Sequence, residues 1–284
     1  MKIKITSDST CDLSPEFIKQ HDISLVPLGV NMNGKAYVDL VDIFPEDIIS
    51  NVDAGGELCT TTAVNMVEYH SLFEKLLEDY DAVVHINIGS GFSSCYQNAC
   101  AAAQDFENVY VIDSENLSTG QGFIASEASL RSENCKTQED VARMCDELRA
   151  LTPRVETSFL LNRLDYMVKG GRCSSVVALG ANLLNLKPCI EVVEGKMKVV
   201  KKYRGAFDKC LLSYVKDRLK ERCSLINERM YITHTAMEQN TLNAVKDAVN
   251  HFGSFNLVEE TVAGCTITCH CGPNCLGLVL LRSE

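Results

Sequence analysis

The sequence predicts an α/β protein in which a first part with a parallel sheet is followed by an α+β part with a mostly antiparallel sheet. Two patterns in the 284 residues support this fold class. Before Pro153, short β-rich runs alternate with helical patterns, as they do where crossover helices connect parallel strands. After Pro153, two β-rich arms surround Glu194-Gly195, which is a hairpin signal. We therefore expect two closely packed domains, residues 1–153 and 154–284.

The first domain is expected to be Rossmann-like. Residues 2–7 are β-rich, and the helix that follows starts at Ser14-Pro15, because serine caps a helix and proline suits its first position. Further β-rich runs predict strands at residues 23–30, 81–88 and 108–113. Helices are predicted at residues 65–79, 95–105, 120–131 and 137–151.

The second domain is expected to be built on antiparallel strands. These are predicted on both sides of the turn in residues 187–204, and at residues 230–235, 256–262 and 276–281. Helices are predicted at residues 174–184, 207–222 and 238–252. Residues 266–271 alternate like a strand, which would place Cys269 and Cys271 on the face opposite His270.

Composition excludes several classes of function. The net charge of -11 opposes binding to nucleic acid, because like charges repel. No run approaches the roughly 18 apolar residues of a membrane span, and the first residues become polar too early for a signal peptide. We therefore expect a cytoplasmic protein without integral membrane association.

The cysteines indicate packing rather than metal binding. Fourteen cysteines without an export signal are expected to be reduced, and many to pack as small apolar side chains. The densest group is Cys265, Cys269, Cys271 and Cys275. Its spacing differs from the Cys-x2-Cys pairs typical of structural zinc, so we expect no metal site.

Two segments rich in hydroxyl side chains are candidates for an anion site. Thr60-Thr61-Thr62 leads into the predicted helix 65–79, and Ser93-Ser94 precedes the predicted helix 95–105. A helix start offers unpaired N–H groups and about half a positive charge. Two or three hydrogen bonds to a charged acceptor, at roughly 1.5–3 kcal/mol each, offset the desolvation of one carboxylate. The alternative is that these hydroxyls are ordinary helix caps.

Other glycine-containing segments are less specific. Gly89-Ser90-Gly91 lacks the spacing of a dinucleotide fingerprint, a phosphate loop or a nucleophile elbow. Arg172, which follows two glycines, could bind an anion, brace the domain junction or form a surface ion pair. His270 could donate to a ligand or satisfy a loop carbonyl.

Taken together, these segments resemble the DegV family of fatty-acid-binding proteins, and the similarity extends over nearly the whole chain. The residues that carry it are Ser7-Asp8-Ser9-Thr10, Thr60-Thr61, Ser90-Gly91-Phe92-Ser93 with Tyr96, Asp165-Tyr166, Lys169-Gly170-Gly171-Arg172, Lys187-Pro188, Arg204-Gly205 and His270-x-Gly272-Pro273-x-x-x-Gly277. The resemblance implies a DegV-like fold with one long-chain fatty acid, such as palmitate, stearate or oleate, between the two domains.

The resemblance also implies roles for individual residues. The carboxylate would be held by Thr61, with Thr60 as its neighbour, and by Ser93, while His270 would lie beside the head group. Thr62-Ala63-Val64 departs from the family pattern and leaves the choice between the two threonines open. Ser94 also departs from the pattern and is expected to add a second hydroxyl to the site.

A partner is implied as well. Some members of the family present the bound fatty acid to a separate kinase, and Arg204 matches an arginine at that partner surface. We therefore expect a lipid-binding protein that is not itself an enzyme and needs no cofactor. The alternative is a serine-dependent acyl hydrolase or transferase that uses Ser93 with His270, which would require an acidic residue to orient the histidine.

Overall fold

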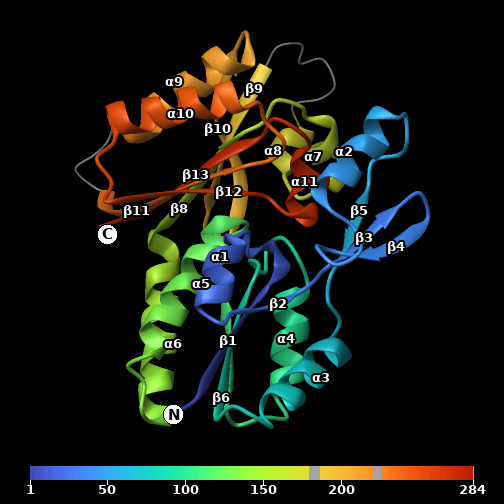
Figure 1. Ribbon diagram of the computed structural model, residues 1–284. Coiled ribbons are helices and arrows are strands. Elements are labelled where there is room, and N and C mark those ends of the chain that lie inside the picture. Colours follow the sequence, from blue (N-terminus) through green and yellow to red (C-terminus); the bar gives the residue numbers. More distant parts are fainter. Residues whose placement is uncertain (179–185, 221–224, 284) are drawn as a thin grey trace.

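The computed structural model describes residues 1–178, 186–220 and 225–283. Figure 1 shows two parts, one around a four-stranded sheet and one around a six-stranded sheet. A third, three-stranded sheet lies beside them. Within the described ranges, no helix is both long and apolar enough to cross a bilayer.

The four-stranded sheet is parallel throughout and has the order β2-β1-β6-β7. Its strands are β1 (Ile3–Asp8), β2 (Ser24–Val26), β6 (Ala82–Asn87) and β7 (Val109–Asp113). The helices of this part are α1 (Pro15–Gln20), α3 (Met66–Leu76), α4 (Cys95–Ala103), α5 (Thr119–Ser132) and α6 (Gln138–Leu151). Helices α5 and α6 cover one face and α3 and α4 the other (Figure 1), so every residue of β6 is buried.

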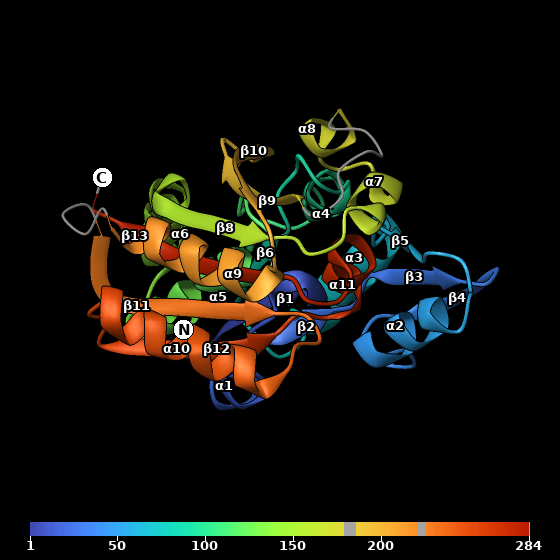
Figure 2. The ribbon, with the colours of Figure 1, turned by 90° about the horizontal axis from the view of Figure 1, so that it is seen from above.

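The six-stranded sheet has the order β10-β9-β8-β13-β11-β12 and is antiparallel except for the pair β11 and β12. Its strands are β8 (Val155–Leu160), β9 (Leu186–Val193), β10 (Lys196–Arg204), β11 (Leu225–His234), β12 (Leu257–Val262) and β13 (Leu276–Arg282). Helices α9 (Phe207–Leu219) and α10 (Gln239–Phe252) lie side by side on its outer face (Figure 2). The parallel first sheet and the mostly antiparallel second sheet are confirmed.

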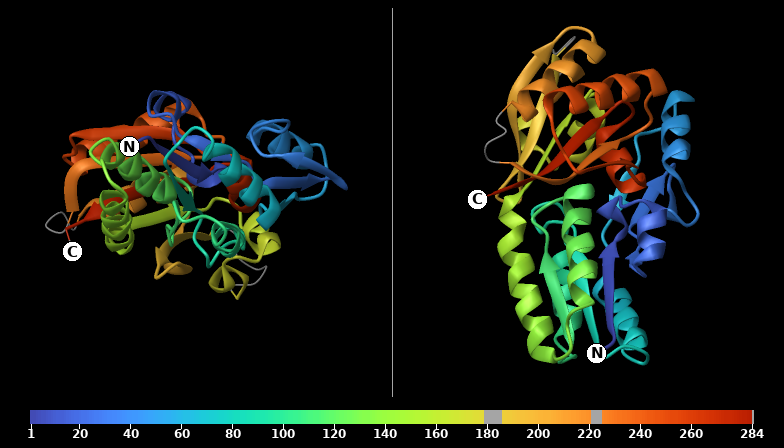
Figure 3. Two further views of the ribbon diagram at one scale, coloured as in Figure 1. Left: turned by 90° about the horizontal axis from the view of Figure 1, so that it is seen from below. Right: turned by 60° about the vertical axis from the view of Figure 1, so that its left-hand side comes forward.

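The small sheet comes from the first part of the chain but packs against the second. Its strands are β3 (Gly29–Met32), β4 (Lys35–Val38) and β5 (Thr60–Thr62), in the order β4-β3-β5. With α2 (Pro45–Asp53) it projects to one side of the parallel sheet (Figure 3). Its apolar side chains form a cluster with cysteines of α11 (Cys265–Cys271). The division into two domains at residue 153 stays a prediction.

Three expectations about local structure were wrong. The predicted strand 23–30 is divided at Pro27, which has no N–H to donate, into β2 and β3 of different sheets. Thr60-Thr61-Thr62 forms strand β5 instead of a helix start, because these β-branched residues pair with β3 while Asn65 caps α3 together with Glu68.

Residues 266–271 form the helix α11 instead of a strand. The reason is tertiary: the carboxylate of Asp12 accepts the Gly264 N–H at 2.8 Å, and Asp39 accepts the Cys265 N–H at 3.1 Å. These distant acids satisfy the first donors of the helix.

The remaining elements of the described residues are four short helices. Between β8 and β9 lie α7 (Asp165–Gly170) and α8 (Ser174–Val177), and two short 3-10 helices are η1 (Ser9–Cys11) and η2 (Thr152–Arg154). The rest of the helix predicted at residues 174–184, from residue 179 on, lies outside the described residues, as does the end of the helix predicted at residues 207–222. Strand β8 and helix α2 were not predicted from the sequence.

Candidate functional site

A cavity of about 200 Å³ lies where the small sheet, the connection between β6 and α4, α7, α11 and the start of β10 meet. Its wall is mostly apolar, with hydroxyl and cationic groups added to it. The apolar side chains are Leu28, Ala63, Ile88, Phe92, Leu117, Phe159, Met167, Met197, Ile267 and Cys271, and the polar ones are Thr61, Thr62, Ser93, Ser94, Arg172, Thr266 and His270.

A second cavity of about 30 Å³ continues the first between the two large sheets. The two cavities share Leu117, Phe159, Ile267 and Cys271. None of these shared residues is charged, so the region where the two cavities adjoin is apolar.

Thr61 and His270 form the central polar pair. Thr61 is held in β5 opposite Val30 of β3, and His270 lies in the last turn of α11. The distance between Thr61 Oγ1 and His270 Nε2 is 2.9 Å. This bond joins a strand from the first part of the chain to a helix from its end.

The imidazole of His270 is neutral at neutral pH. Burial, followed by the positive charge of Arg172, lowers the pKa of His270 to about 4. Nδ1 has no hydrogen-bond partner in the described part of the chain, and it lies so close to Gly170 that a Cβ on this glycine would be 2.1 Å away. An unpaired buried N–H is rarer than an unpaired acceptor, which favours the tautomer with the proton on Nε2. Nε2 then donates to Thr61 Oγ1, and the hydroxyl hydrogen of Thr61 is left for an anion.

Ser93 and Ser94 lie at the start of α4. Ser93 Oγ accepts the Cys95 N–H at 3.3 Å and donates to Cys95 Sγ at 3.2 Å. Ser94 occupies the N-cap position without a capping bond from its side chain. Of the two predicted hydroxyl-rich helix starts, only this one is a helix start.

The loop that carries both serines is fixed by its neighbours. Gly89 N–H donates to the Asn116 carbonyl at 2.7 Å. Gly91 packs on the turn between β9 and β10, where a Cβ would be 2.2 Å from the carbonyl oxygen of Gly195. Only glycine permits this close approach.

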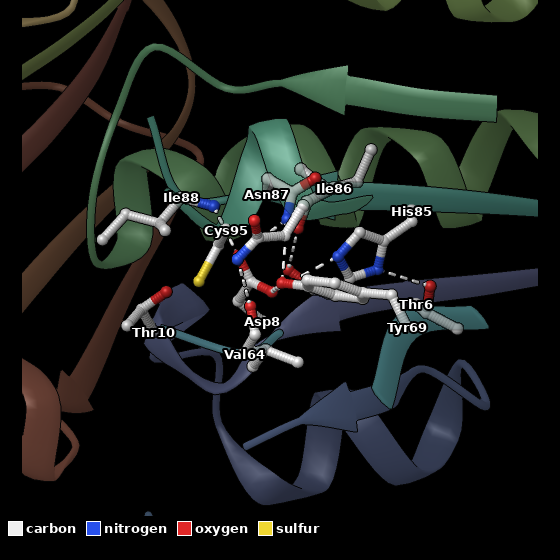
Figure 4. A network of polar contacts seen from close by, with 12 residues as sticks. Thr6, Asp8, Thr10, Val64, Tyr69, His85, Ile86, Asn87, Ile88 and Cys95 are labelled. Carbon is white, nitrogen blue, oxygen red and sulfur yellow. Dashed lines mark hydrogen bonds and ion pairs between the residues drawn. The ribbon is translucent and has the colours of Figure 1, made fainter. Parts of the chain in front are cut away.

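A buried network of polar side chains supports the beginning of the same loop (Figure 4). Asp8 is fully buried and accepts hydrogen bonds from Tyr69 at 2.5 Å, from Asn87 at 3.1 Å and from the Ile88 N–H at 2.9 Å. His85 Nε2 lies 3.3 Å from the carboxylate. Since Ile88 directly follows β6, Asp8 determines where the loop leaves the sheet.

Sequence reasoning missed this network. Its signal was the presence of polar residues, His85 and Asn87, within an apolar run of the buried strand β6. The network reaches α4 as well: burial, followed by the charge of Asp8, raises the pKa of Cys95 to about 11.

The other residues singled out from the sequence are Arg172, Thr60 and Arg204, and only Arg172 among them lines the cavity. Arg172 lines the cavity and also braces it, because its Nη1 donates to the Gly170 carbonyl at 2.7 Å and its Nε to the Phe92 carbonyl at 3.4 Å. Thr60 is exposed and does not line the cavity, unlike Thr61 and Thr62 of the same strand. Arg204 is exposed at the end of β10 and does not line it either.

The cysteines of α11 do not form a metal centre with their neighbours. Among residues 1–178, 186–220 and 225–283, no group of three or more His, Cys, Asp or Glu side chains is arranged to hold a metal ion. The described cysteines are free thiols, and nearly all of them are buried.

Comparisons with known proteins agree on one family. The family model described as "Uncharacterised protein, DegV family" matches residues 2–283. A DegV domain-containing protein of Clostridium acetobutylicum is 33% identical over 99% of both chains.

Solved structures give the same result. A structure described as showing fatty acid binding of a DegV family protein from Thermus thermophilus has a TM-score of 0.85 and 26% identity, over 99% of this chain and 100% of the other. A stearic-acid-binding protein of Eubacterium ventriosum has a TM-score of 0.83 and 25% identity, over 99% and 98%. On these matches over its whole length, the chain belongs to the DegV family.

Proposed function

We propose that this protein binds a long-chain fatty acid, with the carboxylate at Thr61 and Ser93 and the tail in the apolar cavities between the two large sheets. The observation that carries the proposal is that Thr61, Ser93, Ser94 and His270 line one cavity whose wall is otherwise mostly apolar. The fatty-acid-binding descriptions of the Thermus thermophilus and Eubacterium ventriosum proteins support it.

The head group and the tail contribute differently. At about 0.8 kcal/mol for each buried methylene, a sixteen-carbon chain offers on the order of 12 kcal/mol before the costs of binding are subtracted. The hydroxyl donors fix the carboxylate end, because an alcohol or an ester would leave donors unpaired. Arg172 adds a positive charge to the same cavity.

Acyl hydrolysis is less well supported by the geometry. His270 Nε2 is bonded to Thr61, whereas Ser93 donates to Cys95 Sγ. Within the described residues, Nδ1 has no carboxylate to orient it, and a pKa of about 4 makes His270 a poor general base at neutral pH.

We further propose that a partner kinase docks on the part of the surface that includes Arg204. This residue lies nine positions along the chain from Gly195 at the turn of the hairpin, roughly 30 Å in an extended strand. This position, away from the cavity lining, is consistent with the proposed docking role and not with binding of the head group. In a coupled assay with a cognate fatty acid kinase, Arg204→Ala should lower acyl-phosphate yield and leave fatty-acid affinity unchanged; an unchanged yield removes Arg204 from the docking surface.

Lipid analysis tests the main proposal. The purified protein is denatured and extracted, and the extract is examined by mass spectrometry for a fatty acid. Binding is then measured for Thr61→Val and for the matched control Thr60→Val, whose side chain lies off the cavity on the same strand. We expect a co-purifying fatty acid and weaker binding by the Thr61 variant only. No fatty acid in the extract, together with no binding by the wild type, contradicts the proposal.

A further inference from the structure

Two buried cysteines lie beside the Thr61–His270 pair. Cys59 lies two residues before Thr61, and Cys269 directly precedes His270. Both belong to the apolar cluster that joins the small sheet to α11, and each thiol shifts the pKa of the other. The small sheet and α11 are thus joined in two ways, by the packing of this apolar cluster and by the hydrogen bond between the hydroxyl and the imidazole.

The two thiols differ in reactivity. The hydrogen bond from Cys269 lowers the pKa of Cys59, whereas the same contact and burial raise the pKa of Cys269. Burial also raises the pKa of other cysteines, among them Cys11, Cys145 and Cys189. Because the thiolate is the nucleophile, Cys59 is the member of the pair that reacts first.

A second close pair, Cys271 and Cys275, is less informative. The Cys271 thiol raises the pKa of Cys275, but the two residues lie four positions apart around one turn. A bond between them would join neighbouring residues and leave the contact between the two parts of the chain unchanged. Only the Cys59–Cys269 pair joins the first part of the chain to the helix that carries His270.

We propose that Cys59 and Cys269 are an oxidisable pair that forms a reversible disulfide with a hydroperoxide as oxidant, tying β5 to α11 and slowing release of the ligand. The effect on release rests on the proposed function, because it requires the ligand to lie under the Thr61–His270 pair. The disulfide itself does not depend on that function.

The chemistry is balanced with hydrogen peroxide as the oxidant. The Cys59 thiolate attacks one oxygen, the O–O bond breaks, and the hydroxide that leaves takes up a proton to become water. Cys59 is now a sulfenic acid. The sulfur of Cys269 attacks the sulfur of Cys59, the S–O bond breaks, and a second water leaves with the proton of Cys269. The two thiols together lose two electrons, which the peroxide gains.

The disulfide would restrict the separation of β5 from the end of α11. In the reduced protein, the end of α11 at His270 is joined to β5 by the Thr61 hydrogen bond and by packing in the apolar cluster, both of which can break and re-form. An S–S bond of about 2.05 Å requires the two sulfurs to approach and then holds them together. We expect dissociation of the fatty acid to slow by about tenfold, which is less than a disulfide commonly contributes to global stability.

The test uses the full-length, reduced protein loaded with radiolabelled palmitate. One half is treated with hydrogen peroxide, and both halves are analysed by peptide mapping without reductant and by chase with unlabelled palmitate. Cys59→Ser and Cys269→Ser each remove one thiol. The matched control is Cys265→Ser, on the same helix and in the same cluster, where a hydroxyl can replace the thiol that donates to the Ile43 carbonyl.

The proposal predicts a peptide linking Cys59 to Cys269, a dissociation rate about tenfold lower, and recovery with dithiothreitol. Both effects should be lost in the Cys59 and Cys269 variants and retained in the Cys265 variant. Absence of the link, or a link with an unchanged dissociation rate, overturns the proposal. If the reduced protein does not bind palmitate at all, the proposed function fails and the effect on release fails with it, while the peptide map still decides whether the thiols pair.

Discussion

The buried carboxyl group of Asp12 should make stability depend on pH in an unusual direction. Burial raises the pKa of Asp12 from its ordinary 3.8 to about 7, against the opposing effect of hydrogen bonds from Ser118 and Gly264. Between pH 4 and pH 7, the unfolded chain has therefore lost this proton while the folded protein retains it. The free energy of unfolding falls as pH rises through this range and is constant with respect to this group above it. A difference of about three pKa units corresponds to on the order of 4 kcal/mol.

The measurement compares the wild type with Asp12→Asn by urea unfolding at several pH values from 4 to 8. Because the other titrating groups are shared, the difference between the two free energies of unfolding isolates Asp12. We expect the wild type to lose on the order of 4 kcal/mol relative to the variant as pH rises from 4 to 8. A difference that is constant over this range, or that changes in favour of the wild type, would refute the argument from burial.

Three further predictions concern the cavity. Thr61→Val should weaken fatty-acid binding by roughly 10- to 150-fold in titration calorimetry, because one hydrogen bond to a charged acceptor, worth about 1.5–3 kcal/mol, is lost; retained affinity for the acid would argue against the assigned head-group site. Fatty-acid affinity should be constant from pH 6 to 8 in a competition assay, because His270 remains neutral there with its pKa near 4, whereas the stability contributed by His270 is lost as pH falls from 6.5 to 4 and should be absent in His270→Gln. Gly91→Ala should lower the free energy of unfolding by about 2 kcal/mol in urea, because the new Cβ would be 2.2 Å from the Gly195 carbonyl; Ser90→Ala is the neighbouring control, and equal stability of both variants would contradict the contact.

Elements with local signals could be predicted from the sequence. Ser14 caps α1 through a bond from the Phe17 N–H, with Pro15 in the first position. Glu194 and Gly195 both have positive φ and form the turn between β9 and β10. In each case the residues that determine the structure are adjacent in the chain, so a short window contains the whole cause.

Elements that depend on distant partners could not be predicted in this way. Helix α11 begins where Asp12 and Asp39 accept its first N–H groups, and these acids are more than 220 positions away in the sequence. The error at Thr60-Thr61-Thr62 was of another kind, because a local signal was present. Three β-branched residues favour a strand, and Asn65 with Glu68 forms a capping box that marks the true start of α3.

The same difference between local signals and distant partners applies to the candidate site. Thr61, Ser93 and His270 were singled out from the sequence and given their roles through a family resemblance, and the structure places all three around one cavity. Their hydrogen bonds could not be predicted: Thr61 bonds to His270, and Ser93 bonds to Cys95. Such pairings depend on the angle at which β5 and α11 meet, which no single segment contains. Direct contact of these residues with a ligand stays a prediction.

The dependence of α11 on both ends of the chain also has a consequence for biosynthesis. A ribosome makes the parallel sheet, both hydroxyl-rich segments, Asp12 and Asp39 long before it reaches Cys265. Until then the two acids have no helix to hold and Thr61 has no histidine. Contacts of such large sequence separation form late and slowly. The cavity is therefore completed only when nearly the whole chain has been synthesised, and a chain arrested before residue 265 should be unable to retain a lipid.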